Sequence, residues 1–466
     1  MQTDEKIHLQ DAMIIFGGRN DTWELIKQAI IKYGPVTVGY SILPMDYNKT
    51  DYIDKELQPV HYVPIIGWDD NYPAENFIDT QGVLVNPPKT NGAWLVKDSE
   101  SYDLNESEVK YMGDAGFVWI PYDNPSILAK DLKAIIPQAA GIAYIFENNI
   151  DYHVNYQTDL TGLSGFDGNY ACYSNEFKSE YSELIGAVGT YFNGSGISYS
   201  FDVYVNGDKV LTQSGISEFA GFRTIVLNEY ISVKKGDIFK VVFKSNAVPF
   251  QAFSRQHYVS GMSFISKDGK SWSDITLENR TVCFKVYTVR DDSSIISNND
   301  ISVDYTGGKY FAVKVATGDG HVVAGASVKF TISGKSTVVK TNGKGIAEIK
   351  ITQTPGKYTI KTEYNGVTKS NTVIVKQVLT AGKITVKKTA KKFTLKAKLK
   401  INGKLVKGKK ITFKFRGKTY KVKTNKNGIA QKTLKKNVIK KLKKGKTYTV
   451  KLIYLKDTIK TTVKVK

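Results

Sequence analysis

Apolar and polar residues alternate along most of the chain, and this pattern predicts short β-strands. It is clearest at residues 201–205, 239–243 and 282–289. Gly, Asn and Asp separate these runs, as in the turn Asn206-Gly207-Asp208. The sequence therefore predicts a mostly β protein, and seven or more strands at this spacing indicate a β-sandwich at 151–290.

The first 125 residues differ because one helical pattern interrupts the strands. Apolar residues fall on one helical face at Leu25, Ile26, Ala29, Ile30 and Tyr33. Asp21 and Glu24 form a capping-box pattern at its start, and Gly34-Pro35 ends it. Strands are predicted at 36–42, 62–68, 92–97 and 116–122. We expect an α+β half-domain at 1–125 and a connector at 126–150 with one short helical patch.

An internal repeat follows a polar segment at 291–300 that is expected to be a linker. Residues 323–330 match 406–413, and Lys340-Thr341-Asn342 matches Lys423-Thr424-Asn425, both at an offset of 83 residues. The second copy has gained a short insertion around 437–444. Each copy alternates apolar and polar residues, which predicts two tandem immunoglobulin-like β-sandwiches at 301–376 and 377–466.

Positive charge is concentrated in the second repeat. Residues 376–466 hold 31 Lys and one Arg against a single acid, Asp457, whereas the remainder of the chain is mildly acidic. This asymmetry indicates a polyanionic partner, with cell-wall polymer or anionic surface sugar expected first. Readers of nucleic acid favour Arg, so nucleic acid is not the expected ligand. The plainer interpretation is a solvated strand face that keeps sheet edges apart.

Several classes of protein are disfavoured by the motifs. The two cysteines, Cys172 and Cys283, exclude a disulfide scaffold and leave open one disulfide or two buried thiols. No run of apolar residues is long enough to span a membrane, and no signal-peptide pattern is visible at Met1. No cofactor or metal motif occurs, and His8, His153, His257 and His321 are expected to be surface or structural residues.

Four ordered blocks resemble the C-terminal half of papain-like cysteine peptidases. They are residues 26–38, the strand that begins at His61, the segment 92–99 and the segment 113–120. The resemblance implies that His61 occupies the position of the catalytic histidine and that Asp98 occupies the position of the asparagine that orients it. A single lobe of this fold is expected to expose an apolar face, which predicts a partner or packing against the sandwich.

The chain departs from that family at the positions of the residues that carry out or support catalysis. The family's nucleophilic cysteine lies on a helix that precedes all of these blocks, and neither cysteine of this chain has the family's surroundings. Asp98 stands where an asparagine is expected, although a carboxylate also orients an imidazole. Glu100 stands where the family has a shielding tryptophan. The sequence therefore predicts a remnant of a site, His61 with Asp98, that is inactive in this chain.

The segment 151–290 resembles the lectin-like β-sandwich that follows such peptidase domains, through residues such as Cys172-Tyr173-Ser174-Asn175 and Ser271-Trp272. Followed by immunoglobulin-like repeats, this order resembles archaeal adhesin-like surface proteins. Trp272, Tyr173 and His257 are candidates to stack on a sugar if exposed, although the plainer interpretation places them in the core or at its rim.

We therefore expect an extracellular or cell-surface adhesin-like protein that binds carbohydrate or anionic wall polymer. The alternative is a cysteine peptidase whose nucleophile comes from an upstream segment or a partner chain, with a peptide or protein substrate. No cofactor or metal is expected. The oligomeric state, the export route and the ligand stay open at the level of the sequence.

Overall fold

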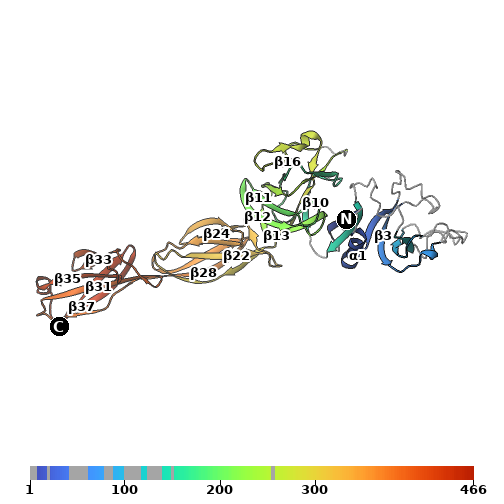
Figure 1. The fold of residues 1–466 in the computed structure, drawn as a ribbon. Helices are drawn as coiled ribbons and strands as arrows, with labels where there is room; N and C mark the ends of the chain where they lie inside the picture. The colour runs from blue at the N-terminus through green and yellow to red at the C-terminus, as the bar shows by residue number, and fades with distance from the viewer. Residues whose placement is uncertain are drawn as a thin grey trace. The chain divides into compact units, whose positions relative to one another are not determined.

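The computed structural model describes residues 8–17, 21–40, 61–77, 88–98, 117–122, 139–147, 152–252, 255 and 258–466. The chain divides into two compact units, Met1–Asp291 and Asp292–Lys466. Figure 1 shows that strands dominate both units, which confirms the prediction of a mostly β, multidomain protein.

One extended sheet runs through the first unit in the order β5-β4-β3-β2-β6-β1-β13-β10-β19-β7. Its N-terminal strands are β1 (His8–Phe16), β2 (Val36–Tyr40), β3 (His61–Asp69), β4 (Ala93–Lys97), β5 (Phe117–Pro121) and β6 (Ala139–Glu147). The others are β7 (Tyr152–Gln157), β10 (Glu183–Phe192), β13 (Gly221–Val233) and β19 (Phe284–Arg290). The four strands predicted before residue 125 correspond to β2, β3, β4 and β5 within the described ranges.

Helix α1 (Thr22–Tyr33) covers one face of the N-terminal strands. Ile26 and Ala29 are buried, and they pack with Val63, Ile65 and other strand residues in one apolar core. The helix ends at Gly34, whose φ of 104° suits glycine. Figure 1 shows α1 beside β3. The helical pattern in the sequence thus predicted this element correctly.

The expectation of a connector at 126–150 was wrong for residues 139–147. These residues form β6, which lies between β2 and β1 in the sheet. Small residues obscured the strand pattern there. Their size is needed because a β-carbon at Gly141 would lie 2.9 Å from Cγ1 of Val36. β1 was likewise not anticipated, since Gln10 and Asp11 are buried polar residues within it.

Two further sheets complete a β-sandwich in the first unit. The larger has the order β12-β11-β14-β9-β16-β17 and the smaller has the order β18-β15-β8. The larger contains β9 (Cys172–Lys178), β11 (Ser198–Val205), β12 (Asp208–Ile216), β14 (Ile238–Lys244), β16 (Ser263–Ser266) and β17 (Ser273–Asp274). The smaller contains β8 (Gly165–Asp167), β15 (Val248–Gln251) and β18 (Thr281–Val282). Short 3-10 helices occur at Ala74–Asn76 and Ile275–Glu278.

Aromatic side chains fill the sandwich core. Phe201, Phe239, Phe243 and Phe284 are 0 or 1% exposed, and Phe243 stacks on Phe201 with 5.6 Å between ring centroids. Burial of such rings is the main stabilising contribution to a sandwich of this size. Alternation along β11, β14 and β19 supplies these residues, as the sequence predicted.

Strands β1 and β13 join the two parts of the extended sheet. Ala12 pairs with Phe222, and Met13 pairs with Gly221. Gly221 has a φ of 120°, and a β-carbon there would lie 2.0 Å from the carbonyl oxygen of Ala12. Glycine is therefore required where β13 approaches β1. The backbone N–H of Thr224 also donates to Oδ1 of Asp11, at 2.6 Å.

The second unit contains two sandwiches in tandem. The first pairs the sheets β20-β22-β26 and β21-β28-β27-β24-β25, and the second pairs a sheet centred on β31 with β30-β37-β36-β33-β34. The first holds β20 (Ser294–Asn298), β21 (Ile301–Asp304), β22 (Tyr310–Ala316), β23 (Val323–Ala324), β24 (Ser327–Ile332), β25 (Lys335–Lys340), β26 (Ile346–Lys350), β27 (Gly356–Tyr364) and β28 (Val367–Lys376). The second holds β29 (Leu379–Thr380), β30 (Ile384–Val386), β31 (Lys392–Ile401), β32 (Lys404–Leu405), β33 (Lys410–Phe415), β34 (Lys418–Lys423), β35 (Ile429–Lys435), α3 (Lys436–Ile439), β36 (Thr447–Tyr454) and β37 (Asp457–Val465).

The segment 291–300, expected to be a linker, contributes a strand instead. β20 lies within it and pairs with β22, and Ile295 is 3% exposed. The only buried apolar residue there, Ile295, is followed by the exposed Ile296, so the segment shows no recognisable alternation and its strand was not predicted.

The two copies of the repeat contain equivalent hydrogen bonds at corresponding residues. The hydroxyl of Thr341 accepts from the N–H of Ala326 at 2.9 Å and donates to the carbonyl of Val323 at 2.6 Å. The hydroxyl of Thr424 accepts from the N–H of Lys409 at 3.0 Å and donates to the carbonyl of Val406 at 2.6 Å. The helix α3 lies in the insertion predicted for the second copy.

Candidate functional site

The structure brings together the two residues that the sequence placed in a remnant site. His61 is the first residue of β3, and Asp98 directly follows β4, the neighbouring antiparallel strand. Nε2 of His61 lies 3.2 Å from Oδ1 of Asp98. The carboxylate is almost completely buried, with 4% of its side chain exposed, and 17% of the imidazole is exposed.

The positions of His61 and Asp98 on neighbouring strands explain why their side chains lie close together. Alternate residues of a strand share one face, so His61 lies on the same face of β3 as the buried Val63 and Ile65. Asp98 follows Val96 in the same way on β4. The pair therefore lies at the margin of the core that α1 covers. The ammonium group of Lys97 donates to the carbonyl of Asp98 at 2.7 Å and helps to hold the backbone there.

This arrangement is chemically suited to orienting a histidine base. A carboxylate that accepts from Nε2 fixes the proton on that nitrogen and leaves Nδ1 as the basic nitrogen. It also stabilises the imidazolium that forms when the base takes a proton. Residues 99 and 100, including Glu100 at the position of the shielding tryptophan, lie outside the described residues.

Neither cysteine of the chain is placed as a nucleophile. Cys172 begins β9 and Cys283 precedes β19, so both belong to the sandwich, where they are separate buried thiols. Burial raises the pKa of the Cys172 thiol and raises that of Cys283 well above its ordinary value. A nucleophilic cysteine needs the opposite, a lowered pKa and access to substrate. The open alternative of one disulfide or two buried thiols resolves to two buried thiols.

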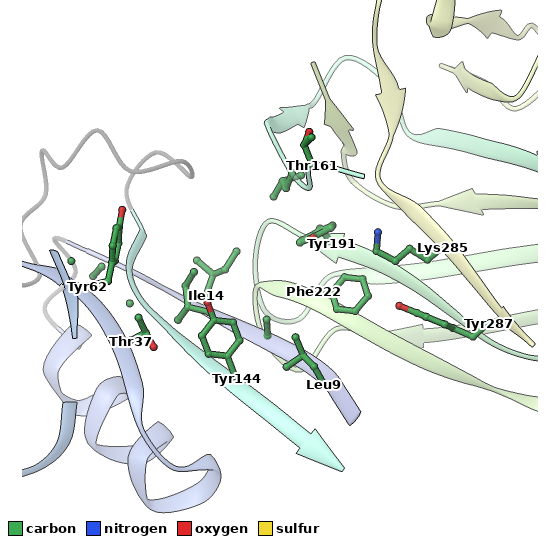
Figure 2. Close-up of a pocket in the computed structure, with 16 residues that line it drawn as sticks. Leu9, Ile14, Thr37, Tyr62, Tyr144, Thr161, Tyr191, Phe222, Lys285 and Tyr287 are labelled. Carbon is green, nitrogen blue, oxygen red and sulfur yellow. The ribbon is translucent and has the colours of Figure 1, made fainter. Parts of the chain in front are cut away.

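A cavity of about 620 Å³ lies where the N-terminal strands meet the sandwich. Figure 2 shows Tyr62, Thr37 and Tyr144 on its N-terminal side, and Tyr191, Lys285 and Tyr287 on its sandwich side. Tyr62 follows His61 but faces the other side of β3. Tyr62 is 53% exposed, Leu9 is 40% exposed and Tyr144 is 38% exposed. This side of the N-terminal strands therefore carries apolar side chains that are partly packed against the sandwich and partly exposed.

The polar corner of this cavity is built around Lys285. Its ammonium group donates to Oδ2 of Asp159 and to Oε1 of Gln157, both at 2.7 Å. Asp159 is 1% exposed, and burial raises the pKa of its carboxyl against the opposing effect of Lys285. Lys285 is thus held by the sandwich at the edge of an aromatic cavity.

The three candidates for sugar stacking have different outcomes. Tyr173 is 0% exposed and its hydroxyl lies 2.8 Å from that of Thr190, so it is a core residue. Trp272 is half-buried and lines a groove on the outer face of the sandwich. His257 lies outside the described residues. The other polar residues of that groove were not predicted from the sequence, because a period of two along β11 and β14 shows only that they face outward.

The described histidines outside the remnant site have structural surroundings. Nδ1 of His153 lies 2.9 Å from the buried Oε2 of Glu183, and Nδ1 of His321 lies 2.9 Å from Oδ2 of Asp319. Within the described ranges, no group of three or more His, Cys, Asp and Glu residues lies together in a way that would hold a metal ion. In that same part of the chain, no helix is both long and apolar enough to cross a membrane.

Comparison with known proteins identifies the sandwich. Residues 155–288 match the family model of the Lectin like domain. No curated protein matches the chain.

Among the solved structures that resemble this chain, three illustrate the range of similarity. The crystal structure of the cysteine protease and lectin-like domains of Cwp84, a surface layer associated protein of Clostridium difficile, has 24% identity and a TM-score of 0.46 over 61% of this chain and 64% of that chain. The clostridial cysteine protease Cwp84 after propeptide cleavage has 23% identity and a TM-score of 0.45 over 61% and 72% of the chains. A Ca²⁺-stabilised adhesin of an Antarctic bacterium has 11% identity and a TM-score of 0.16 over 93% and 90%.

These TM-scores lie below 0.5, so the structural likenesses carry no argument about activity or ligand. The first of them is also matched over less than two thirds of its length. The family model supports one statement, and it agrees with the sequence: the sandwich of the first unit contains a lectin-like domain at residues 155–288.

Proposed function

We propose that the protein is a non-catalytic, adhesin-like protein of the cell surface that binds saccharide or anionic wall polymer. The observation that carries this proposal is the contrast between its two candidate sites. The lectin-like sandwich has a well-packed aromatic core and open surface grooves. The remnant site has a base and an orienting carboxylate, and the chain's two thiols are buried in the sandwich.

The second unit supports a role in display and attachment. In this proposal its two sandwiches are immunoglobulin-like stalk modules, and the second one attaches the chain by charge. β34 is an edge strand of that sandwich, and Lys418, Lys421 and Lys423 on it are exposed. Closely spaced lysines attract a polyanion over a range that salt shortens, since the Debye length is about 8 Å at physiological ionic strength.

Retention of the full chain on immobilised anionic wall polymer tests this function. Retention is expected at low salt and should fall steeply as salt rises. The triple variant Lys418→Gln, Lys421→Gln and Lys423→Gln should be retained more weakly.

The matched control is Lys335→Gln with Lys340→Gln on β25, because these exposed residues hold the same positions in the first repeat. It should leave retention unchanged. Equal losses in both variants, or retention insensitive to salt, would contradict attachment by the second repeat.

One observation favours a second candidate, a cysteine peptidase completed by an upstream segment or a partner chain. The contact of 3.2 Å between His61 and Asp98 is the base side of such a site. In this alternative His61 is the general base, Asp98 orients it, and a peptide or protein is the substrate. The nucleophile would then have to lie on the His61 side of β3, within reach of Nδ1 of the imidazole.

A further inference from the structure

A second groove, of about 730 Å³, lies on the outer face of the larger sandwich sheet. Along β11, Phe201, Val203 and Val205 are buried in the core, while Asp202 and Tyr204 point outward into the groove. β14 repeats the arrangement with Lys240 and Lys244 outward. The groove is therefore formed by regular strands with a packed core beneath, which makes it a rigid surface.

An aromatic wall borders the groove on the side of β16. The ammonium group of Lys240 lies 5.4 Å from the ring centroid of Trp272 and 5.4 Å from that of Phe264. Cation–π contacts of this kind hold the lysine and the indole in place. Together with Tyr204 on β11, Trp272 offers an aromatic surface beside ordered polar groups.

The charges of the groove are balanced. Its basic residues are Lys209, Lys240 and Lys244, and its acidic residues are Glu176, Asp202 and Asp268. This composition contrasts with the Lys-rich second repeat, because it gives no net attraction for a polyanion or a polycation.

The acidic residues differ in how they are engaged. Asp202 pairs with Lys209 at 3.3 Å and accepts from Thr212, and Asp268 accepts from the backbone N–H groups of Lys270 and Ser271. The carboxylate of Glu176 has no hydrogen bond or ion pair within the described part of the chain, although Lys240 is its cross-strand neighbour. Glu176 is therefore an available acceptor beside Lys240 on the floor of the groove.

A buried hydroxyl group on the same face of β9 also favours a binding site here. Ser174 lies between Cys172 and Glu176, both of which line the groove, and alternation places it on their side of β9. It is 0% exposed, and its Oγ has no hydrogen-bond partner among the described residues. A buried polar atom without a partner is costly, and a role in binding is one explanation for its presence beneath the groove.

We propose that this groove binds a neutral saccharide chain. The apolar C–H faces of a pyranose ring would pack on Trp272 and Tyr204, while its hydroxyl groups would donate to Glu176 and Asp202 and accept from Lys240 and Lys244. Alternating donors and acceptors suit hydroxyl groups, which do both. The inference deepens the proposed surface-binding function, and it rests on that function.

The test is binding of the full chain to an immobilised panel of neutral oligosaccharides and of uronic-acid or sulfated oligosaccharides. The wild-type chain should bind neutral members, with little dependence on salt. Glu176→Gln and Trp272→Ala should each lower the affinity at least about tenfold, as expected when a central hydrogen bond or an aromatic anchor is lost. Glu176→Gln keeps the side-chain size, so it separates a loss of ligand contact from a loss of folding.

Two exposed residues outside the groove serve as matched controls. Glu278→Gln repeats the Glu-to-Gln change, and Tyr181→Ala removes an exposed aromatic ring of a different type from Trp272; both should leave the affinity unchanged. Neutral binding that survives both groove variants would overturn the site. Binding to acidic members alone, or to none, would overturn the ligand class. Failure of the proposed function is distinguishable, because it is measured separately as loss of salt-dependent retention on wall polymer.

Discussion

Glu183 shows how single polar residues hold the lectin-like sandwich together. Its carboxylate is buried and accepts from the hydroxyl of Tyr156 at 2.6 Å and from that of Thr288 at 2.7 Å. Nδ1 of His153 lies 2.9 Å from the same group. Burial, and then the bond to Glu183, raises the pKa of Tyr156 to about 12. One carboxylate on β10 thus interacts with groups from two other strands, β7 and β19.

Glu183→Ala is expected to lower the free energy of unfolding by about 3 kcal/mol, because several buried donors lose their acceptor at once. Chemical denaturation measures the change. Glu180→Ala, which removes an exposed carboxylate three residues away, should change stability by less than about 0.5 kcal/mol. Similar effects of the two substitutions would contradict the assigned network.

Some residues of the candidate sites could be predicted from the sequence and others could not. His61 and Asp98 were found through motifs, because the two short segments that carry them have distinctive residue types. The groove residues Glu176 and Lys240 were missed because charged residues facing outward from a strand look like any solvated face. Their shared location depends on the pairing of β9 with β14, which no local pattern encodes.

Among the elements, the pairing of β1 with β13 depends most on residues that are far apart in the sequence. The two strands are more than 200 residues apart in sequence, yet Met13 pairs with Gly221. The helix α1 was predictable because its period of 3.6 residues is local. β6 and β20 were not predictable, because their residues are small or polar and show no clear alternation. Their strand structure becomes evident only from pairing with neighbouring strands.

Gly221→Ala is expected to disrupt this joint and to cost about 3 kcal/mol, because the new methyl group would overlap the carbonyl of Ala12 in a backbone conformation that disfavours side chains. Hydrogen exchange of β1 and β13 measures the loss. Gly196→Ala is the matched control, since Gly196 has a φ of 71° and no atoms within 4 Å of the added carbon. It should cost about 1 kcal/mol. Unchanged protection of β1 in Gly221→Ala would refute the pairing.

The repeats allow a paired prediction at the level of the strand connections. Thr341→Val and Thr424→Val should each lower the stability of their own sandwich by about 1–2 kcal/mol, because each removes the same buried acceptor and donor. Thermal unfolding measures both. Thr337→Val, at an exposed position of β25, should have little effect. Unequal losses at Thr341 and Thr424 would indicate that the two copies are stabilised differently.

In the whole molecule, the proposed binding of saccharide and the proposed attachment by charge belong to different parts of the chain. The lectin-like sandwich carries a charge-balanced groove, and the second repeat carries the excess of lysine. The N-terminal strands hold the contact between His61 and Asp98, whereas the chain's two thiols lie buried in the sandwich. Composition along the chain predicted this division, whereas the grooves required the folded sheets.

We expect no catalysis by this chain, and covalent labelling of its thiols is the test. The purified 466-residue chain is incubated with an epoxide that alkylates the active-site thiol of papain-like enzymes, and adducts are measured by mass spectrometry. No adduct is expected, because Cys172 and Cys283 are buried and burial raises the pKa of both thiols. A stoichiometric adduct that disappears in His61→Ala would contradict the account and establish a working cysteine peptidase site.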